Sequence, residues 1–246
     1  MEQAFSGFSP QTAEFFLGLA VNNSKEYYRA HKAGFDRHVI QPLTALARDL
    51  EPLLQKIDPG FETRPVQGKA IARLRRDTRF TKDKTPFRTN LWLGYRRPSE
   101  ENSRCLGFFF DVSAFNVSWG MGMYAPYRPL MEEVRGRILQ KPREFAALVG
   151  REAFTGRFAL EGEAYRRPVL REGRPEVLDW GNRKYVAAIH AQPLDASAFS
   201  ADLAQAVWAD FLLLAPLYRL FRGMAPIRIE ETDEPYILPR YKEEST

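Results

Sequence analysis

The chain is poor in the residues and segments that mark several common classes of protein. Its 246 residues include one cysteine, Cys105, so an internal disulfide cannot form. No run approaches the roughly 18 apolar residues that a membrane span needs. The start, MEQAFSGFSPQ, lacks the basic and apolar regions of a signal peptide. These absences predict a soluble, cytoplasmic protein with no membrane association.

Motifs that commonly carry catalysis are also scarce. The sequence has three histidines and no H-E-x-x-H, C-x-x-C, G-x-S-x-G, phosphate-loop or dinucleotide motif. His31 and His38 lie seven residues apart, on roughly one helical face, and are interpreted as surface or core histidines. Cys105 stands in a strand-like run and is interpreted as a small buried hydrophobic residue. We therefore predict no metal and no cofactor.

What the chain does have is a dense cluster of positive charge. From Arg64 to Arg97, eleven lysines and arginines face two acidic residues, Asp77 and Asp83, which gives this segment a net charge of +9. The whole chain carries +5, so the remaining residues together carry −4. Positive charge confined to one segment suits an anionic ligand in a discrete pocket or groove.

The pattern of elements predicts a single α+β domain with a mainly antiparallel sheet, a meander of about four to six strands, packed by N-terminal, middle and C-terminal helices. No linker or internal repeat divides the chain. An acidic tail ends it, and the sequence leaves open whether the tail is solvated or folds back on the basic segment. The expected parts are helices in 1–60, strands with a charged loop in 64–124, helices and returning strands in 127–222, and the tail in 229–246.

Helix signals mark the first part. Ser9 followed by Pro10 predicts a helix start, and this helix should end near Val21. Asn23 has the spacing of a capping box with Glu26, which predicts Asn23 as the N-cap of a second helix. Gly34 is expected to interrupt that helix before a third, which should stop at residues 58–60.

Alternating patterns predict the strands. At residues 70–75, small apolar side chains alternate with Ile71, Arg73 and Arg75, so a strand here would point two arginines outward. Residues 106–112 (LGFFFDV) are apolar on both faces, which predicts a central strand covered on both sides. A Ser and Gly face at 117–123 indicates close packing of a helix or of a ligand. Other expected strands are 90–95, 158–161 and 185–191, and other expected helices are 127–140, 142–148 and one from about 200 to Gly223.

The charged loop at residues 78–89 is expected to be ordered. Thr85-Pro86-Phe87 should fix its backbone, with Phe87 and Phe80 as aromatic anchors. Converging arginines can bind polyanionic groups. The predicted anion-binding residues are Arg73, Arg75, Arg76, Arg79, Lys82, Lys84, Arg88 and Asn90. The predicted supporting residues are Asn22, Asn23, Lys25, Asp83, Trp119 and Tyr124.

A family resemblance falls on these same residues. The string RLRRDTRFTKDKTPFRTN at residues 73–90 resembles the signature R-x-x-R-D-x-R-F-[ST]-K-D-K-[ST]-P-[YF]-[KR]-T of a bacterial and fungal family of conserved hypothetical proteins, a domain of unknown function. FFLGLAVNNSKEYYRAHKAGF at 15–35 and LGFFFDVS with GMGMYAP at 106–126 are similar to other segments of that family. The resemblance implies where a site lies and implies no reaction.

Three interpretations of the basic segment remain open. In the first, it binds a small anionic ligand carrying phosphate or carboxylate, or alternatively nucleic acid, with Trp92, Trp119 or Tyr124 available to stack. In the second, the protein is a metal-independent enzyme in which Asp77, with Arg79 and Asn90, acts on a small anionic substrate beside the Asn22-Asn23 turn. In the third, the charges form an ion-pair lattice that only braces a long loop.

Overall fold

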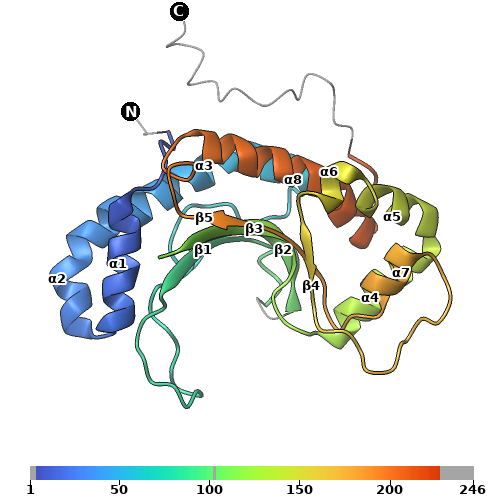
Figure 1. The fold of residues 1–246 in the computed structure, drawn as a ribbon, viewed down its shortest axis with the longest axis horizontal. Coiled ribbons are helices and arrows are strands. Elements are labelled where there is room, and N and C mark those ends of the chain that lie inside the picture. The colour runs from blue at the N-terminus through green and yellow to red at the C-terminus, as the bar shows by residue number, and fades with distance from the viewer. Residues whose placement is uncertain (1–3, 102–103, 228–246) are drawn as a thin grey trace, which may run out of the picture.

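The computed structural model describes residues 4–101 and 104–227. A five-stranded sheet lies at the centre, in the order β1-β2-β3-β5-β4, and every neighbouring pair is antiparallel. Helices α3 and α8 lie against one face of this sheet, α1 and α2 flank one end, and α4 to α7 gather at the other (Figure 1). The predicted α+β class with an antiparallel sheet is confirmed.

The N-terminal helices follow their sequence signals with two exceptions. They are α1 (Pro10–Val21), α2 (Lys25–Phe35), a π-helical turn η1 (Asp36–Ile40) and α3 (Gln41–Ile57). The cap of α2 is Ser24, whose side chain accepts a hydrogen bond from the Tyr27 amide at 3.1 Å. The prediction of Asn23 as the N-cap is therefore wrong. Gly34 does not interrupt α2, because the backbone stays helical through the π-helical turn into α3.

The sheet strands are β1 (Asn90–Tyr95), β2 (Leu106–Ser113), β3 (Asn116–Met123), β4 (Ala159–Glu161) and β5 (Ala187–Pro193). β2 lies inside the sheet, paired with β1 on one side and β3 on the other. The prediction that helices cover both of its faces is wrong, because Phe109 on one face is only partly buried. An apolar run can arise on a half-open strand when a ring such as that of Phe109 lies on the uncovered face.

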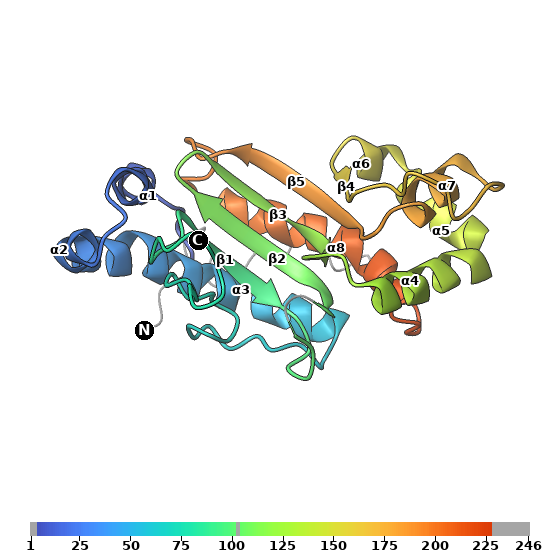
Figure 2. The same ribbon diagram turned by 90° about the horizontal axis from the view of Figure 1, so that it is seen from below.

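The two faces of the sheet differ in their contacts. One face buries a row of large side chains, among them Leu93, Phe110 and Trp119, against α3 and α8. The other face is turned away from both helices, and Figure 2 shows β1, β2 and β3 with no helix in front of them. We call this second surface the open face. Its residues on β1 to β3 are Asn90, Trp92, Gly94, Gly107, Phe109, Asp111, Ser113, Asn116, Ser118, Gly120 and Gly122.

Glycines allow the strands to approach closely on this face. A Cβ added at Gly120 would lie 2.0 Å from the Ala188 carbonyl oxygen of β5, and one at Gly122 would lie 2.4 Å from the Ala187 Cα. These distances are far below van der Waals contact, so only glycine fits here. The Ser and Gly pattern of β3 thus results from contact with the neighbouring strand, which is neither of the two causes expected from the sequence.

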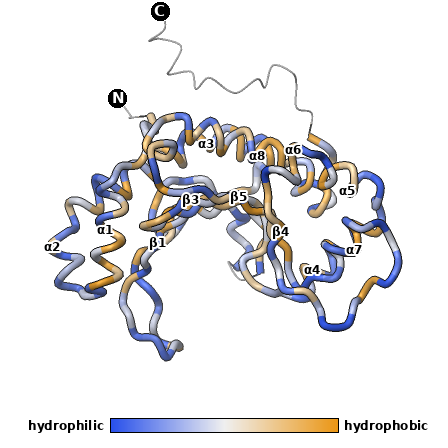
Figure 3. The backbone as a smooth tube through the Cα atoms, in the orientation of Figure 1, coloured by the Kyte–Doolittle hydropathy of each residue, from blue (hydrophilic) through white to orange (hydrophobic). Residues whose placement is uncertain are grey.

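Residues 73–89 form a long hairpin-like arm that leaves the sheet on the side of its open face (Figure 1). The arm is mainly hydrophilic, as Figure 3 shows. The predicted strand at 70–75 is an extended segment with isolated bridges rather than a regular strand. The Ala72 amide donates to the Trp92 carbonyl oxygen at 2.9 Å, and the Gly94 amide donates to the Ala70 carbonyl oxygen at 2.8 Å. The segment therefore runs beside the edge of β1 before the arm begins.

The C-terminal half adds helices around the returning strands. α4 (Arg128–Gln140), α5 (Pro142–Val149) and α8 (Asp202–Phe221) were expected, whereas α6 (Glu152–Thr155) and α7 (Pro175–Gly181) were not. α8 is long and apolar enough to span a membrane by length and composition, but most of it is buried against the sheet and α3. α8 therefore serves as a core helix. The expected acidic tail, 229–246, lies outside the described residues.

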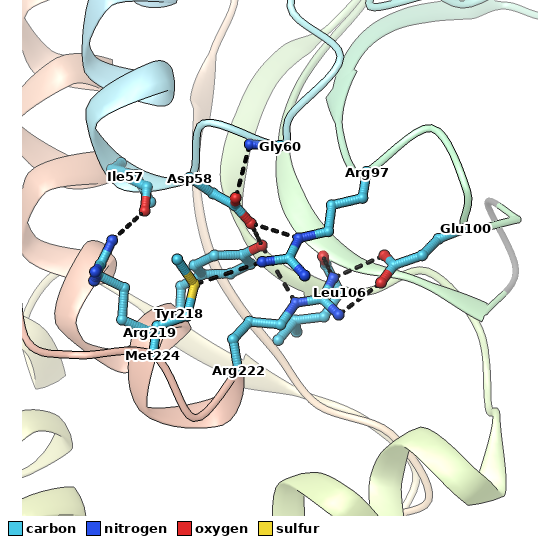
Figure 4. Close-up of polar contacts among 10 residues, drawn as sticks. All are labelled: Ile57, Asp58, Gly60, Arg97, Glu100, Leu106, Tyr218, Arg219, Arg222 and Met224. Carbon is cyan, nitrogen blue, oxygen red and sulfur yellow. Dashed lines mark hydrogen bonds and ion pairs between the residues drawn. The ribbon is translucent and has the colours of Figure 1, made fainter.

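A polar network joins the ends of α3 and α8 to the loop between β1 and β2 (Figure 4). The carboxylate of Asp58, 3% exposed, accepts hydrogen bonds from Tyr218 at 2.6 Å and Arg97 at 2.9 Å. Arg222 forms a two-pronged pair with Glu100, with both N···O distances at 2.7 Å. The other carboxylate oxygen of Asp58 accepts from the Gly60 amide at 2.9 Å, so both oxygens of this buried group have partners, as buried charge requires.

Candidate functional site

The arm is held to the helical part of the protein at Phe87. The Asn23 side chain donates to the Phe87 carbonyl oxygen and accepts from the Phe87 amide, both at 3.0 Å. The Phe87 ring also stacks on Tyr28, with 4.9 Å between the ring centroids. Phe87 is thus one aromatic anchor. The expected second anchor, Phe80, is 89% exposed and anchors nothing, because it lies outside the core near the tip of the arm.

Both acidic residues of the arm are occupied by arginines. Arg79 binds Asp77 through two hydrogen bonds, at 3.0 and 2.7 Å, which lower the pKa of Asp77 to about 2. Arg76 binds Asp83. The hydrogen bonds that Asp83 accepts from Arg76 and, with a smaller effect, from Thr85 lower the pKa of Asp83. These two pairs brace the arm, in agreement with the ion-pair interpretation for four of its charged residues.

Three other arginines have no such partner. Within the described residues, the guanidinium groups of Arg73, Arg75 and Arg88 make no hydrogen bond or ion pair with the protein. Arg88 lies over the Trp92 ring, 4.8 Å from its centroid, and its Nε atom is buried without a partner. A buried donor without a partner costs free energy, so its hydrogen-bonding capacity is available to a ligand.

These arginines line one cavity of about 700 Å³ at the base of the arm. Arg73, Arg75 and Arg88 share it with Trp92 and Gly94 of the open face. A second cavity of about 520 Å³ lies beside it and is lined by Arg73 and Arg75 together with the predicted supporting residue Lys25. Further cations and one acid on the wall of the first cavity are Lys69, Arg76, Asp77, Arg79 and Arg96.

The remaining predicted residues lie elsewhere. Lys84 donates to the Thr78 carbonyl oxygen at 2.8 Å and helps to shape the arm. Lys82 and Asn22 are exposed, and neither lines the two cavities. Tyr124 is 74% exposed and lies at the end of β3.

Trp119 is not available to stack on a ligand. Its side chain is 0% exposed on the covered face of the sheet, where its indole N–H donates to Asp210 at 2.7 Å. The expectation that Trp119 could bind a ligand is therefore wrong. The period-two pattern of β3 did not reveal which of its two faces the helices cover.

The sequence did not predict one polar pair on the open face. Asn90 donates to the Oδ2 atom of Asp111 at 2.6 Å, so Asn90 contacts β2 rather than Asp77. Burial raises the pKa of Asp111 to about 6, although the hydrogen bond from Asn90 acts in the opposite direction. A carboxyl group with a strongly shifted pKa is a common mark of a functional site. The signal in the sequence was an aspartate inside the apolar run LGFFFDV.

Comparison with known families identifies the family to which the chain belongs. A family model described as conserved hypothetical protein (DUF2461) matches residues 11–220, which extend from α1 to α8 and include the arm and the open face. The chain belongs to this family. No curated protein matches the chain. The match to DUF2461 covers the candidate site and assigns no chemistry to it.

Proposed function

We propose that the protein binds a phosphate- or carboxylate-bearing ligand in the cavity at the base of the arm, as a cytoplasmic protein. The observation that carries this proposal is that Arg73, Arg75 and Arg88 line one cavity and have no hydrogen-bond or ion-pair partner within residues 4–101 and 104–227. Guanidinium groups bind carboxylate and phosphate through paired hydrogen bonds. An anion would supply the partners that these three groups lack.

The ion pairs of the arm support this role. Arg76 with Asp83 and Arg79 with Asp77 use the local acids, so no acidic side chain of the arm remains to neutralise the other arginines. The Asn23 contact fixes the arm relative to α2. Arginines that are already held in place lose less conformational freedom when they bind a ligand.

The test is calorimetric titration of the protein with inorganic pyrophosphate and with citrate at low salt. We expect the Arg75→Ala, Arg88→Ala double variant to bind at least about tenfold more weakly, because it loses two charge-assisted contacts. The matched control is Arg143→Ala with Arg151→Ala, which removes two exposed cations on and next to α5 and should bind like the parent. Equal affinity of both double variants, or no binding of either anion, would overturn the proposal.

A second candidate function is metal-independent catalysis at this site. The sequence suggested Asp77 as the base, but its pKa of about 2 makes it a poor proton acceptor near neutral pH. Asp111, with a pKa of about 6, suits proton transfer better and lies on the same open face as Trp92. A phosphatase and hydrolase substrate screen that Asp111→Asn leaves unchanged would remove this candidate.

A further inference from the structure

Two aromatic side chains stand on the open face next to the arginine cavity. Trp92 of β1 and Phe109 of β2 are both only partly buried. Trp92 pairs across the strands with Asp111, and Phe109 pairs with Gly94, so the two rings are diagonal neighbours on one face. Gly94 has no side chain, so nothing projects from β1 directly opposite Phe109, and planar groups can stack on exposed aromatic rings of this kind.

Hydrogen-bonding groups lie beside these rings. Asp111 stands directly across from Trp92 on one side and from Ser118 of β3 on the other. Asn90 binds the Oδ2 atom of Asp111, and no protein donor among the described residues binds its Oδ1 atom. The open face thus offers a carboxylate oxygen, an amide oxygen and a hydroxyl group to the edge of a stacked ring.

The cations lie at the border of this surface. Trp92 lines the same cavity as Arg73 and Arg75, and Arg88 covers part of its ring. A ligand that reached both regions would place an anionic group on the arginines and a planar group on the open face. A phosphate joined to a heteroaromatic base has this composition.

We propose that the ligand carries a nucleobase, as a nucleotide or as single-stranded nucleic acid. Its base stacks on Trp92 and Phe109, its edge bonds to Asp111 and Asn90, and its phosphate binds Arg73, Arg75 and Arg88. Sheets that expose aromatic side chains bind unstacked bases in this way, and carboxylate and amide side chains bind base amino groups. This inference rests on the proposed anion binding and adds the chemical class of the ligand.

The experiment compares three probes on the full chain: a twelve-nucleotide single strand of mixed sequence, an equal mixture of the four nucleoside monophosphates, and inorganic tripolyphosphate. Binding is followed by calorimetry and by tryptophan fluorescence. We expect Phe109→Leu, which leaves every arginine in place, to weaken the nucleobase probes by about tenfold through lost stacking. Tripolyphosphate binding should not change.

Phe115→Leu is the matched control. Phe115 is 76% exposed in the turn between β2 and β3, away from Trp92, so its replacement should affect no probe. Trp92→Leu is a second variant and should weaken the nucleobase probes and abolish their effect on fluorescence. If the single-stranded oligonucleotide binds more tightly than the monophosphates, the ligand is nucleic acid. If the two probes bind with equal affinity per site, the ligand is a nucleotide. Both results support the proposal.

Two other outcomes separate the proposals. If tripolyphosphate binds as tightly as the strand and Phe109→Leu changes neither, the nucleobase inference is overturned and anion binding stands. If none of the three probes binds, anion binding itself is overturned, and the nucleobase inference falls with it.

Discussion

Asp111 shows at the scale of one residue how position sets the chemistry of a side chain. It lies on the open face, but the strands around it and Trp92 across from it remove enough water to raise its pKa to about 6. Burial disfavours the charged form of a carboxyl group, whereas the Asn90 hydrogen bond favours it. Asp111 can therefore change its charge close to physiological pH.

Replacing Asn90 should shift this equilibrium further. Asn90→Ala removes the hydrogen bond that stabilises the carboxylate, so we expect the pKa of Asp111 to rise above about 6. Carboxyl carbon chemical shifts followed through a pH titration measure this pKa directly. An unchanged or lower pKa in the variant would show that the Asn90 contact does not control it.

The same raised pKa predicts a pH-dependent stability difference. Because the folded-state pKa lies above that of the unfolded chain, Asp111 lowers the free energy of unfolding as pH rises from about 4 through 6. Asp111→Asn should therefore be more stable than the parent at pH 8 by on the order of 2 kcal/mol and should show no advantage below pH ~4. Urea unfolding at both pH values measures the difference. A constant difference across this range would contradict the prediction.

At this scale the sequence located the basic residues but not their roles. Counting charge identified the arginines of the arm, because charge is a local property of the chain. It did not separate Arg76 and Arg79, which are paired, from Arg73 and Arg75, which are not. That distinction depends on the folded path of the arm.

At the scale of elements, the strands of the sheet approach so closely that two glycines should respond differently to the same substitution. Gly120→Ala places a Cβ 2.0 Å from a backbone oxygen of β5 and should cost about 3 kcal/mol of unfolding free energy. At Gly94 the added Cβ meets only the Trp92 side chain, at 3.6 Å, so Gly94→Ala should change stability by less than about 0.5 kcal/mol. Denaturant unfolding tests the pair, and equal effects would contradict the role given to Gly120.

The Asn23 contact should control the order of the arm. Asn23→Ala removes two hydrogen bonds to the Phe87 backbone, so we expect faster hydrogen exchange at the Phe87 amide and faster tryptic cleavage between residues 73 and 89. Asn22→Ala is the matched control, because Asn22 is exposed and its side chain makes no hydrogen bond among the described residues. If the two variants behave alike, the arm is held by other contacts.

Element boundaries show where local signals suffice. Ser9 with Pro10 located the start of α1, and the strand at 90–95 was predicted with the bounds of β1. The capping interpretation of Asn23 failed because a tertiary contact with Phe87, 64 residues away, uses its side chain. α7 was missed because it is short and lies in a segment rich in arginine, proline and glycine.

At the scale of the whole molecule, the Asp58 network should contribute to global stability. Asp58→Ala leaves Tyr218 and Arg97 without their buried acceptor and should cost about 3 kcal/mol. Glu101→Ala removes an exposed pair with Arg104 and should cost less than about 1 kcal/mol. Denaturant unfolding of both variants measures the difference. A loss for Asp58→Ala no larger than for Glu101→Ala would assign the network a minor role.

The network also predicts the direction of acid sensitivity. Burial alone would raise the pKa of Asp58, but hydrogen bonds from Tyr218, Arg97 and the Gly60 amide outweigh it, and the net pKa is lowered. The stabilisation is therefore present above about pH 4 and is lost as pH falls through the folded-state pKa. Asp58→Ala should abolish the part of the acid-induced decrease in unfolding free energy that comes from protonation of Asp58.

The overall class followed from the sequence, whereas the arrangement did not. An antiparallel meander was expected, and β1, β2 and β3 form one. The positions of β5 next to β3 and of β4 at the edge depend on pairing between segments that are far apart in the chain. The open face results from the same arrangement, because α3 and α8 cover only one side of the sheet.

The edges of the sheet have a consequence for self-association. An open sheet normally risks recruiting a strand from another copy, which leads to aggregation. Along β1, backbone groups of Trp92 and Gly94 are already bonded to Ala72 and Ala70, and the opposite edge strand, β4, is only three residues long. The protein can therefore leave one face of its sheet without a covering helix, while the edges of the sheet offer few free backbone groups to a strand of a neighbouring chain.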